Sequence, residues 1–182
     1  SQIQERLIER MLKPDEHLAD SGYSKSMVLV KSKQNGIDLI APVKADGNIQ
    51  AKNFPAYAMA QFAIDWEKRM ATCPQGKHAQ VWTPSSRSGA TYIRFNPSDC
   101  VACDARSMCI KSSAPARTLK LLPQDQFQAL TQARLDQKTA AFKRRYARRA
   151  GAESMISQGT RAFALRASRY IGLAKTHLQH VA

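Results

Sequence analysis

The feature that most restricts the fold of this chain is a set of four cysteines in its middle. They lie within 37 positions, each beside turn residues, as Cys73-Pro74-Gln75-Gly76, Cys100-Val101-Ala102-Cys103 and Cys109. A Cys-Pro-x-Gly turn can direct backbone amides at a thiolate, and Cys-x-x-Cys places two sulfurs on one short loop. Four thiolates complete a tetrahedral coordination sphere, so the spacing predicts a structural Zn²⁺ site.

Two other states of these cysteines remain open, buried free thiols and disulfides. Nothing in the sequence indicates export, and a reducing compartment disfavours disulfides. His78 is a possible substitute ligand. A metal is favoured, because a region with so few apolar residues needs a further source of stability.

The first segment, residues 1–43, has the patterns of alternating helix and strand. Apolar spacing predicts a helix over 3–13, a short strand ending at Asp20, a helix over 25–34 and a buried strand over 37–43. Strand, helix and strand in succession predict a right-handed βαβ unit of an α/β sheet.

The rest of the chain falls into two further segments, 44–120 and 121–182. The first is rich in turn residues, and its short apolar runs predict a β-rich unit with strands at 62–66, 80–82 and 91–95. The second is helical. We expect a helix from Pro123 that Gly151 interrupts, then a helix over 152–166 and a helical tail.

Positive charge is concentrated at the C-terminal end. The chain carries 28 Lys and Arg against 14 Asp and Glu, and residues 137–182 contain ten basic residues but one acid, Glu153. This favours a polyanionic partner, nucleic acid before anionic lipid, although such a run can also be a solvated surface. No run of eighteen or more apolar residues occurs, so we expect no membrane span.

Two carboxylates are candidates for metal chemistry. Asp20 ends a predicted strand, and α/β folds place their chemistry at that rim of the sheet, although Asp20 could instead start a turn. Glu153 could pair with Arg149 or Arg161, or hold a divalent cation among groups that bind phosphates.

Four features resemble, in order, the DDE transposases of bacterial insertion sequences. Ala19-Asp20-Ser21-Gly22-Tyr23 is similar to the motif of their second Asp, and Tyr146-x2-Arg149-x3-Glu153 has the spacing around their last acid. The cysteine-bearing segment and the closing residues 151–180 resemble one branch of the superfamily. One position departs: the signature has Lys where this chain has Thr160, followed by Arg161.

The resemblance implies an α/β, ribonuclease H-like fold with a β-rich four-cysteine zinc insert and C-terminal helices. It implies that Asp20 and Glu153 are the second and third acids of a site for two catalytic Mg²⁺ ions, which cleaves and transfers DNA strands. Only nineteen residues precede Asp20, so we expect the first strands and the first Asp to lie outside this chain, which alone would be inactive.

The implied partner is double-stranded DNA, both transposon ends and target, in the bacterial cytoplasm at the nucleoid, with a homodimer in the synaptic complex. The residues expected to contact it are Lys143, Arg144, Arg145, Arg148, Arg149, Arg161, Arg166, Arg169 and Lys175. Two alternatives are a non-catalytic zinc-containing DNA-binding protein derived from a transposase, and a zinc-ribbon-like nucleic-acid module unrelated to transposition.

Overall fold

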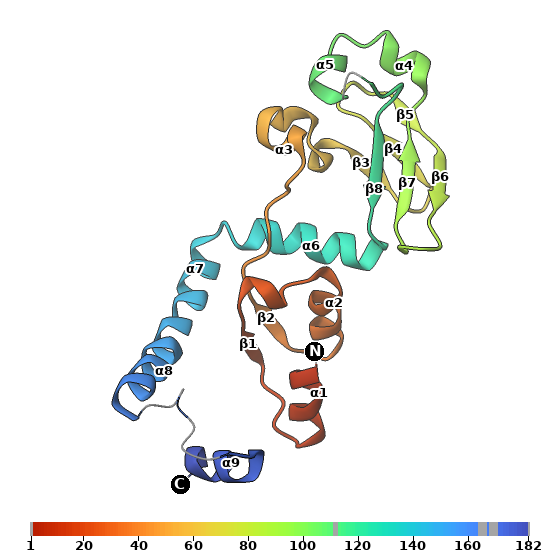
Figure 1. The fold of residues 1–182 in the computed structure, drawn as a ribbon. Coiled ribbons are helices and arrows are strands. Elements are labelled where there is room, and N and C mark those ends of the chain that lie inside the picture. The colour runs from red at the N-terminus through yellow and green to blue at the C-terminus, as the bar shows by residue number, and fades with distance from the viewer. Residues whose placement is uncertain (1, 111–112, 164–166, 168–170, 182) are drawn as a thin grey trace. The chain divides into compact units, whose positions relative to one another are not determined.

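The computed structural model describes residues 2–110, 113–163, 167 and 171–181, and its fold is mixed α/β with three small sheets (Figure 1). By compactness the chain divides into a first unit, Ser1–Thr139, and a second unit, Ala140–Ala182. The sequence predicted instead a core formed by 1–43 and 121–182 with an insert at 44–120. Compactness does not test this division, which stays a prediction.

The first unit begins with the predicted strand, helix and strand. Strands β1 (Glu16–Leu18) and β2 (Asp38–Ile40) pair in parallel, joined through the short helix η1 (Ser21–Tyr23) and α2 (Ser26–Gln34). The predicted βαβ arrangement, in which a helix connects two parallel strands, is therefore confirmed. The preceding helix, α1 (Gln2–Glu9), is shorter than expected because the chain turns at Met11, whose φ is +56°.

A buried polar chain fastens α1 to the parallel strands. Gln4 is completely buried; its side-chain oxygen accepts from Ser32 Oγ at 3.0 Å, and its nitrogen lies 3.2 Å from His17 Nδ1. Burial lowers the pKa of His17, because a charged imidazole is poorly solvated there. These hydrogen bonds hold helix α1, helix α2 and strand β1 together. They also satisfy polar groups that burial removes from water.

Two antiparallel sheets of three strands form the middle of the chain. Their strand orders are β3-β4-β5 and β6-β7-β8, and their bounds are β3 Ala63–Asp65, β4 Met70–Thr72, β5 His78–Ala79, β6 Val81–Pro84, β7 Thr91–Arg94 and β8 Thr118–Leu121. The three predicted strands correspond to β3, β6 and β7, while β4, β5 and β8 were not predicted. A buried cluster that includes Phe62, Ile93, Phe95 and Leu119 joins both sheets.

Short helices surround these sheets, and one longer helix links them to the βαβ unit. The short helices are α3 (Ile49–Asn53), η2 (Pro55–Tyr57), η3 (Met59–Gln61), α4 (Pro97–Val101) and α5 (Arg106–Cys109). The longer helix, α6 (Gln124–Asp136), packs against α2 and places Phe127 against Trp66 with ring centroids 5.7 Å apart.

The described residues of the second unit form the helices α7 (Ala140–Ala147), α8 (Arg149–Phe163) and α9 (Leu173–Val181). The predicted interruption at Gly151 is wrong, because Gly151 lies inside α8. The breaks fall instead at 137–139 and at Arg148. Within the described ranges, no helix is both long and apolar enough to cross a membrane.

Candidate functional site

The first cysteine lies in a tight turn directly after β4. The amide of Gly76 donates to the carbonyl of Cys73 at 2.8 Å, and the amide of Lys77 donates to Cys73 Sγ at 3.3 Å. The turn requires a residue with φ of +76° at Gly76, which glycine adopts without a Cβ clash. This backbone conformation therefore presents an amide dipole to the sulfur, which stabilises a thiolate.

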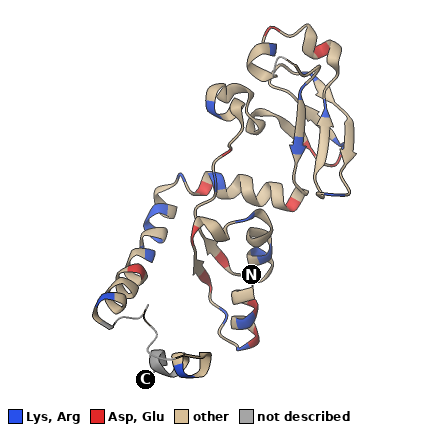
Figure 2. Ribbon diagram, viewed as in Figure 1, with Lys and Arg blue, Asp and Glu red and all other residues tan. Residues whose placement is uncertain are grey.

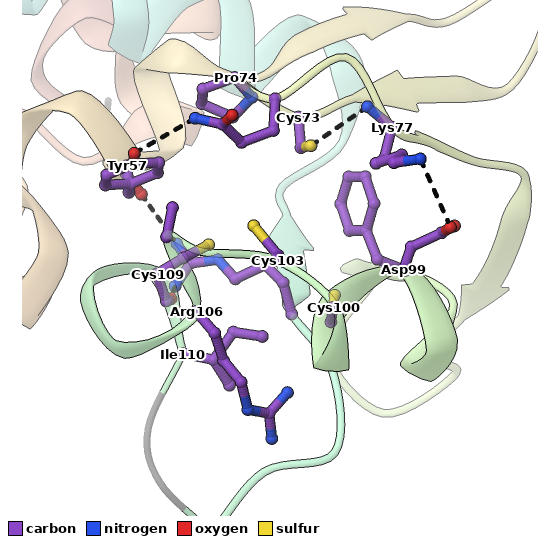
Figure 3. Close-up of a pocket in the computed structure, with 14 residues that line it drawn as sticks. Tyr57, Cys73, Pro74, Lys77, Asp99, Cys100, Cys103, Arg106, Cys109 and Ile110 are labelled. Carbon is purple, nitrogen blue, oxygen red and sulfur yellow. Dashed lines mark hydrogen bonds and ion pairs between the residues drawn. The ribbon is translucent and has the colours of Figure 1, made fainter.

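The other three cysteines reach the same place from two short helices. Cys100 lies in α4, Cys103 follows that helix, and Cys109 ends α5. The four side chains line one cavity of about 30 Å³, and Figure 3 shows their sulfurs around a common space. A cavity of this size holds little more than one water molecule or one ion.

The cavity is partly protected from solvent and lies against the core. Cys73, Cys100 and Cys109 pack on the buried cluster of the two sheets. Burial is the main cause that raises the pKa of Cys109, and the neighbouring cysteines raise it further. Among the described residues, however, no three His, Cys, Asp or Glu side chains have an arrangement that could hold a metal ion. Zinc would have to draw these sulfurs together to Zn–S distances of about 2.3 Å.

An arginine that the sequence analysis did not single out borders the cavity. Arg117 Nη1 donates to the carbonyl of Cys109 at 2.8 Å, and its guanidinium lies 5.4 Å from the centre of the Phe62 ring. Burial lowers the pKa of Arg117, and the charge of Cys109 acts in the opposite direction. No carboxylate of the described chain forms an ion pair with it. The carboxylate of Asp46 also acts on this half-buried cation from a distance, in the same direction as Cys109. Positive charge at this position would offset the negative charge of thiolates in the cavity.

The motif around Glu153 forms a connected chain of side chains within the second unit. Arg149 Nη1 lies 2.6 Å from Glu153 Oε1 and also donates to the hydroxyl of Tyr146 at 3.3 Å. The Tyr146 ring stacks on Phe142 with centroids 5.8 Å apart. These residues follow one another at helical spacing, so they share one side of α7 and of the start of α8. The ion pair considered for Glu153 from sequence is therefore present.

Basic residues lie along a second side of α7 and continue past its end to Arg148 and the start of α8. Lys143, Arg144 and Arg148 are exposed, whereas Arg145 and Arg149 are half-buried. Figure 2 shows this run of basic residues along α7, with one acidic residue at the start of α8. Arg161 and Lys175 are exposed on α8 and α9. Two other residues expected to contact DNA, Arg166 and Arg169, lie outside the described residues.

Asp20 lies two residues past the end of β1, whereas the sequence predicted it as the last residue of this strand. It precedes η1, with extended backbone angles, and its carbonyl accepts from the amide of Tyr23 at 2.9 Å. Its side chain is exposed and makes no capping hydrogen bond to η1. Asp20 belongs to the first unit and Glu153 to the second, so each is described within its own unit.

The connected Tyr146–Arg149–Glu153 motif and the four-cysteine cavity both fall in the part of the chain that a known family covers. A family model described as transposase DDE domain matches residues 72–182, more than half of the chain. The chain belongs to this family. Comparisons with curated proteins and with solved structures find no match.

Membership of the transposase DDE domain family implies a role in transposition and an interaction with DNA. The matched region includes Glu153 and all four cysteines, whereas Asp20 precedes it. The match therefore confirms the resemblance to DDE transposases, whereas the assignment of the four cysteines to a zinc insert stays a prediction. The role of Asp20 depends on its position at the end of β1 and on its local sequence.

Proposed function

We propose that this chain serves DNA transposition, in which a metal-dependent DDE transposase cleaves DNA strands and transfers them. The observation that supports this most is the contact chain from Tyr146 through Arg149 to Glu153, inside the region that the family model matches. In this proposal Glu153 is the last acid of the catalytic set, and the adjacent Arg149 can hold its side chain in one orientation.

In this proposal Asp20 and Glu153 are two carboxylates of the catalytic site, in a ribonuclease H-like fold. Carboxylate oxygens are the ligands that Mg²⁺ prefers, and bound metal supplies Lewis-acid stabilisation of the attacking and leaving oxygens. Within the described residues no three suitable side chains form such a site, and the two acids belong to different units. In the proposal Asp20 and Glu153 would each supply a carboxylate oxygen to the metal.

The four-cysteine cavity has a structural role in this proposal. Thiolates of Cys73, Cys100, Cys103 and Cys109 would bind one Zn²⁺ and hold α4, α5 and the turn after β4 together. The donor set fits zinc, since it consists of four sulfurs, one of which already accepts a backbone amide. The metal would stabilise loops whose apolar contacts are few.

The exposed basic side of α7 would contact the phosphates of double-stranded DNA. Lys143, Arg144 and Arg148 carry positive charge on one side, while Glu153 and its partner Arg149 lie on the other. Phosphate contacts position DNA without reading its sequence, so this side would serve transposon ends and target alike.

The experiment that tests this function measures transposition of a marked element in bacteria, with the protein expressed from its natural gene. Glu153→Gln keeps the size and polarity of the side chain but removes the charge that binds metal. We expect loss of transposition by at least about a hundredfold, because a metal ligand is removed. Glu67→Gln, at an exposed glutamate in the turn between β3 and β4, is the matched control and should transpose normally.

Asp20→Asn should give the same loss as Glu153→Gln if both acids bind metal. Both variants should still bind duplex DNA, since neither residue is basic. Transposition at the normal frequency with Glu153→Gln would exclude the catalytic assignment. It would favour the alternative function, a zinc-containing DNA-binding protein without catalysis.

A further inference from the structure

The outer face of the sheet β6-β7-β8 carries no assigned role, and its composition is unusual for an uncovered surface. Strand register brings its residues together in two rows, Thr83–Tyr92–Lys120 and Val81–Arg94–Thr118. All six side chains are exposed, because the opposite face, with Ile93 and Leu119, is the one that packs in the core. The outer face contains two cations and an aromatic ring but no acid.

One cation of this face lies over the aromatic ring. Lys120 Nζ lies 5.8 Å from the centre of the Tyr92 ring, and Arg94 is two residues from Tyr92 on the same strand. Side chains two apart on a strand share a face. Figure 2 shows the basic residues of β7 and β8 near each other in the sheet.

A hollow of about 420 Å³ continues this face past β8. Thr118 and Lys120 line both the face and the hollow, and Asn48, Gln50 and Arg117 line the hollow as well. None of the nine residues that line it is acidic. Asn48 supplies an amide group, which suits the edge of a nucleobase, and Lys120 supplies positive charge for a phosphate. The amide nitrogen of Gln50 already donates to the carbonyl of Cys109 at 3.2 Å, which leaves its side-chain oxygen as an acceptor. Arg117 donates to two backbone carbonyls, so it adds charge there without being a contact residue.

We propose that this face and the adjoining hollow bind an unpaired strand of DNA, with one base stacked on Tyr92 and its flanking phosphates at Arg94 and Lys120. Base stacking on an exposed ring needs an unpaired base, since a duplex offers base faces only at its ends. A duplex groove admits a helix or a two-stranded ribbon, whereas this face is three strands wide. The inference depends on the proposed function only in taking DNA as the partner.

The test measures binding of the full chain to fluorescein-labelled dT12 and to a twelve-unit abasic strand of equal charge, by fluorescence anisotropy. Tyr92→Leu should weaken dT12 binding by about 5- to 150-fold, the range for loss of one stacked base. It should leave binding of the abasic strand unchanged. Tyr92→Phe keeps the ring and should bind dT12 like the unmodified chain.

Charge substitutions test the same surface independently of the ring. Arg94→Gln and Lys120→Gln should each weaken both strands and reduce the salt slope by about 0.7, the value for one phosphate contact of a single strand. Lys33→Gln, at an exposed lysine of α2, is the charge-matched control and should change neither. The Gln variants also decide the case if Tyr92→Leu does not fold.

Equal binding of dT12 by Tyr92→Leu and the unmodified chain would overturn the proposal, as would equal losses on dT12 and the abasic strand. Tighter binding of rU12 than of dT12 would overturn the choice of DNA. The proposed function is tested separately, because Tyr92→Leu should not affect duplex binding and substitutions on α7 should. Loss of transposition in Glu153→Gln together with weaker dT12 binding in Tyr92→Leu supports both conclusions.

Discussion

Replacement of three exposed basic residues, two in α7 and Arg148 directly after it, gives the most quantitative test of the proposed contact with duplex DNA. In the variant Lys143→Gln/Arg144→Gln/Arg148→Gln the helix loses its outward charge, while the opposite side with Tyr146 and the Arg149–Glu153 ion pair is retained. Glutamine is a good helix former, so α7 should remain folded. The change should therefore isolate phosphate contact from structure.

The magnitude follows from the number of exposed cations. Each phosphate contact on duplex DNA contributes about 0.9 to the slope of log affinity against log salt, so three contacts contribute about 2.7. Over a fourfold rise in salt the unmodified chain should then lose about 40-fold more affinity than the variant. At low salt the variant should bind all duplex sequences more weakly, by similar factors, because phosphates carry no sequence information.

Fluorescence anisotropy of a labelled 30-base-pair duplex, titrated at four salt concentrations, measures the slope directly. Circular dichroism of the variant verifies that the helices are intact. Lys33→Gln in α2 controls for a general loss of positive charge and should leave the slope within error. If the triple variant has the slope of the unmodified chain, this side of α7 is only a solvated surface, and DNA is held elsewhere.

Two further predictions concern the first unit. Elemental analysis of the purified chain should find one zinc, and none in Cys103→Ser. Arg117→Met should retain the zinc but bind it more weakly in competition with a chelator, because a cation beside the thiolates is removed. Absence of zinc from both the unmodified chain and Cys103→Ser would refute the site. Because burial lowers the pKa of His17, the unfolded chain takes up the proton first as pH falls. The contribution of His17 to the free energy of unfolding should be complete above about pH 6.5 and decrease below it. As it decreases, the α1 amides should exchange hydrogen faster, and His17→Gln should remove this pH dependence.

Sequence periodicity predicted the elements that have a clear apolar pattern. The βαβ unit was predicted because helix α2 separates two short apolar strands, and β7 because its residues alternate. Strand β5, in contrast, is two residues long, which is too short for any periodicity to be recognised. Strand β8 does alternate between buried and exposed residues, but it begins at Thr118, next to the boundary expected at 120/121.

The helical break shows how tertiary contacts override local preference. Glycine costs about 1 kcal/mol in a helix relative to alanine, which predicts an interruption at Gly151. Helix α8 tolerates this cost at Gly151, which is exposed. The helical segment is interrupted after Asp136 instead. There Gln137 accepts a hydrogen bond from the amide of Val43 at 3.0 Å, and Thr139 donates to the carbonyl of Asp136 at 2.7 Å. The bond between Thr139 and Asp136 is local, whereas Val43 lies 94 positions from Gln137, so that contact is not visible in a window of sequence around the break.

The candidate site was predictable to the extent that its residues are close in sequence. Cysteine spacing predicted a shared location for four side chains, and three of them lie within ten positions of one another. Arg117 was not predicted, since its position beside Cys109 results from the way β8 enters the sheet. Its charge carried no local signal, because 28 basic residues occur in the chain and burial of one of them depends on the fold.

The ion pair of Glu153 does not argue against its proposed role as a metal ligand. The glutamate side chain is 57% exposed and its partner Arg149 is 25% exposed, and pairs of this kind stabilise a protein by about 0–1 kcal/mol. A divalent cation competes for the carboxylate with twice the charge, so it can replace so weak a partner. In the absence of metal the same arginine keeps the carboxylate on the side of Tyr146 and restricts its rotamers. The two interpretations that the sequence left open, ion pair and metal ligand, are therefore compatible, and the transposition frequency of Glu153→Gln tests whether Glu153 is a catalytic acid.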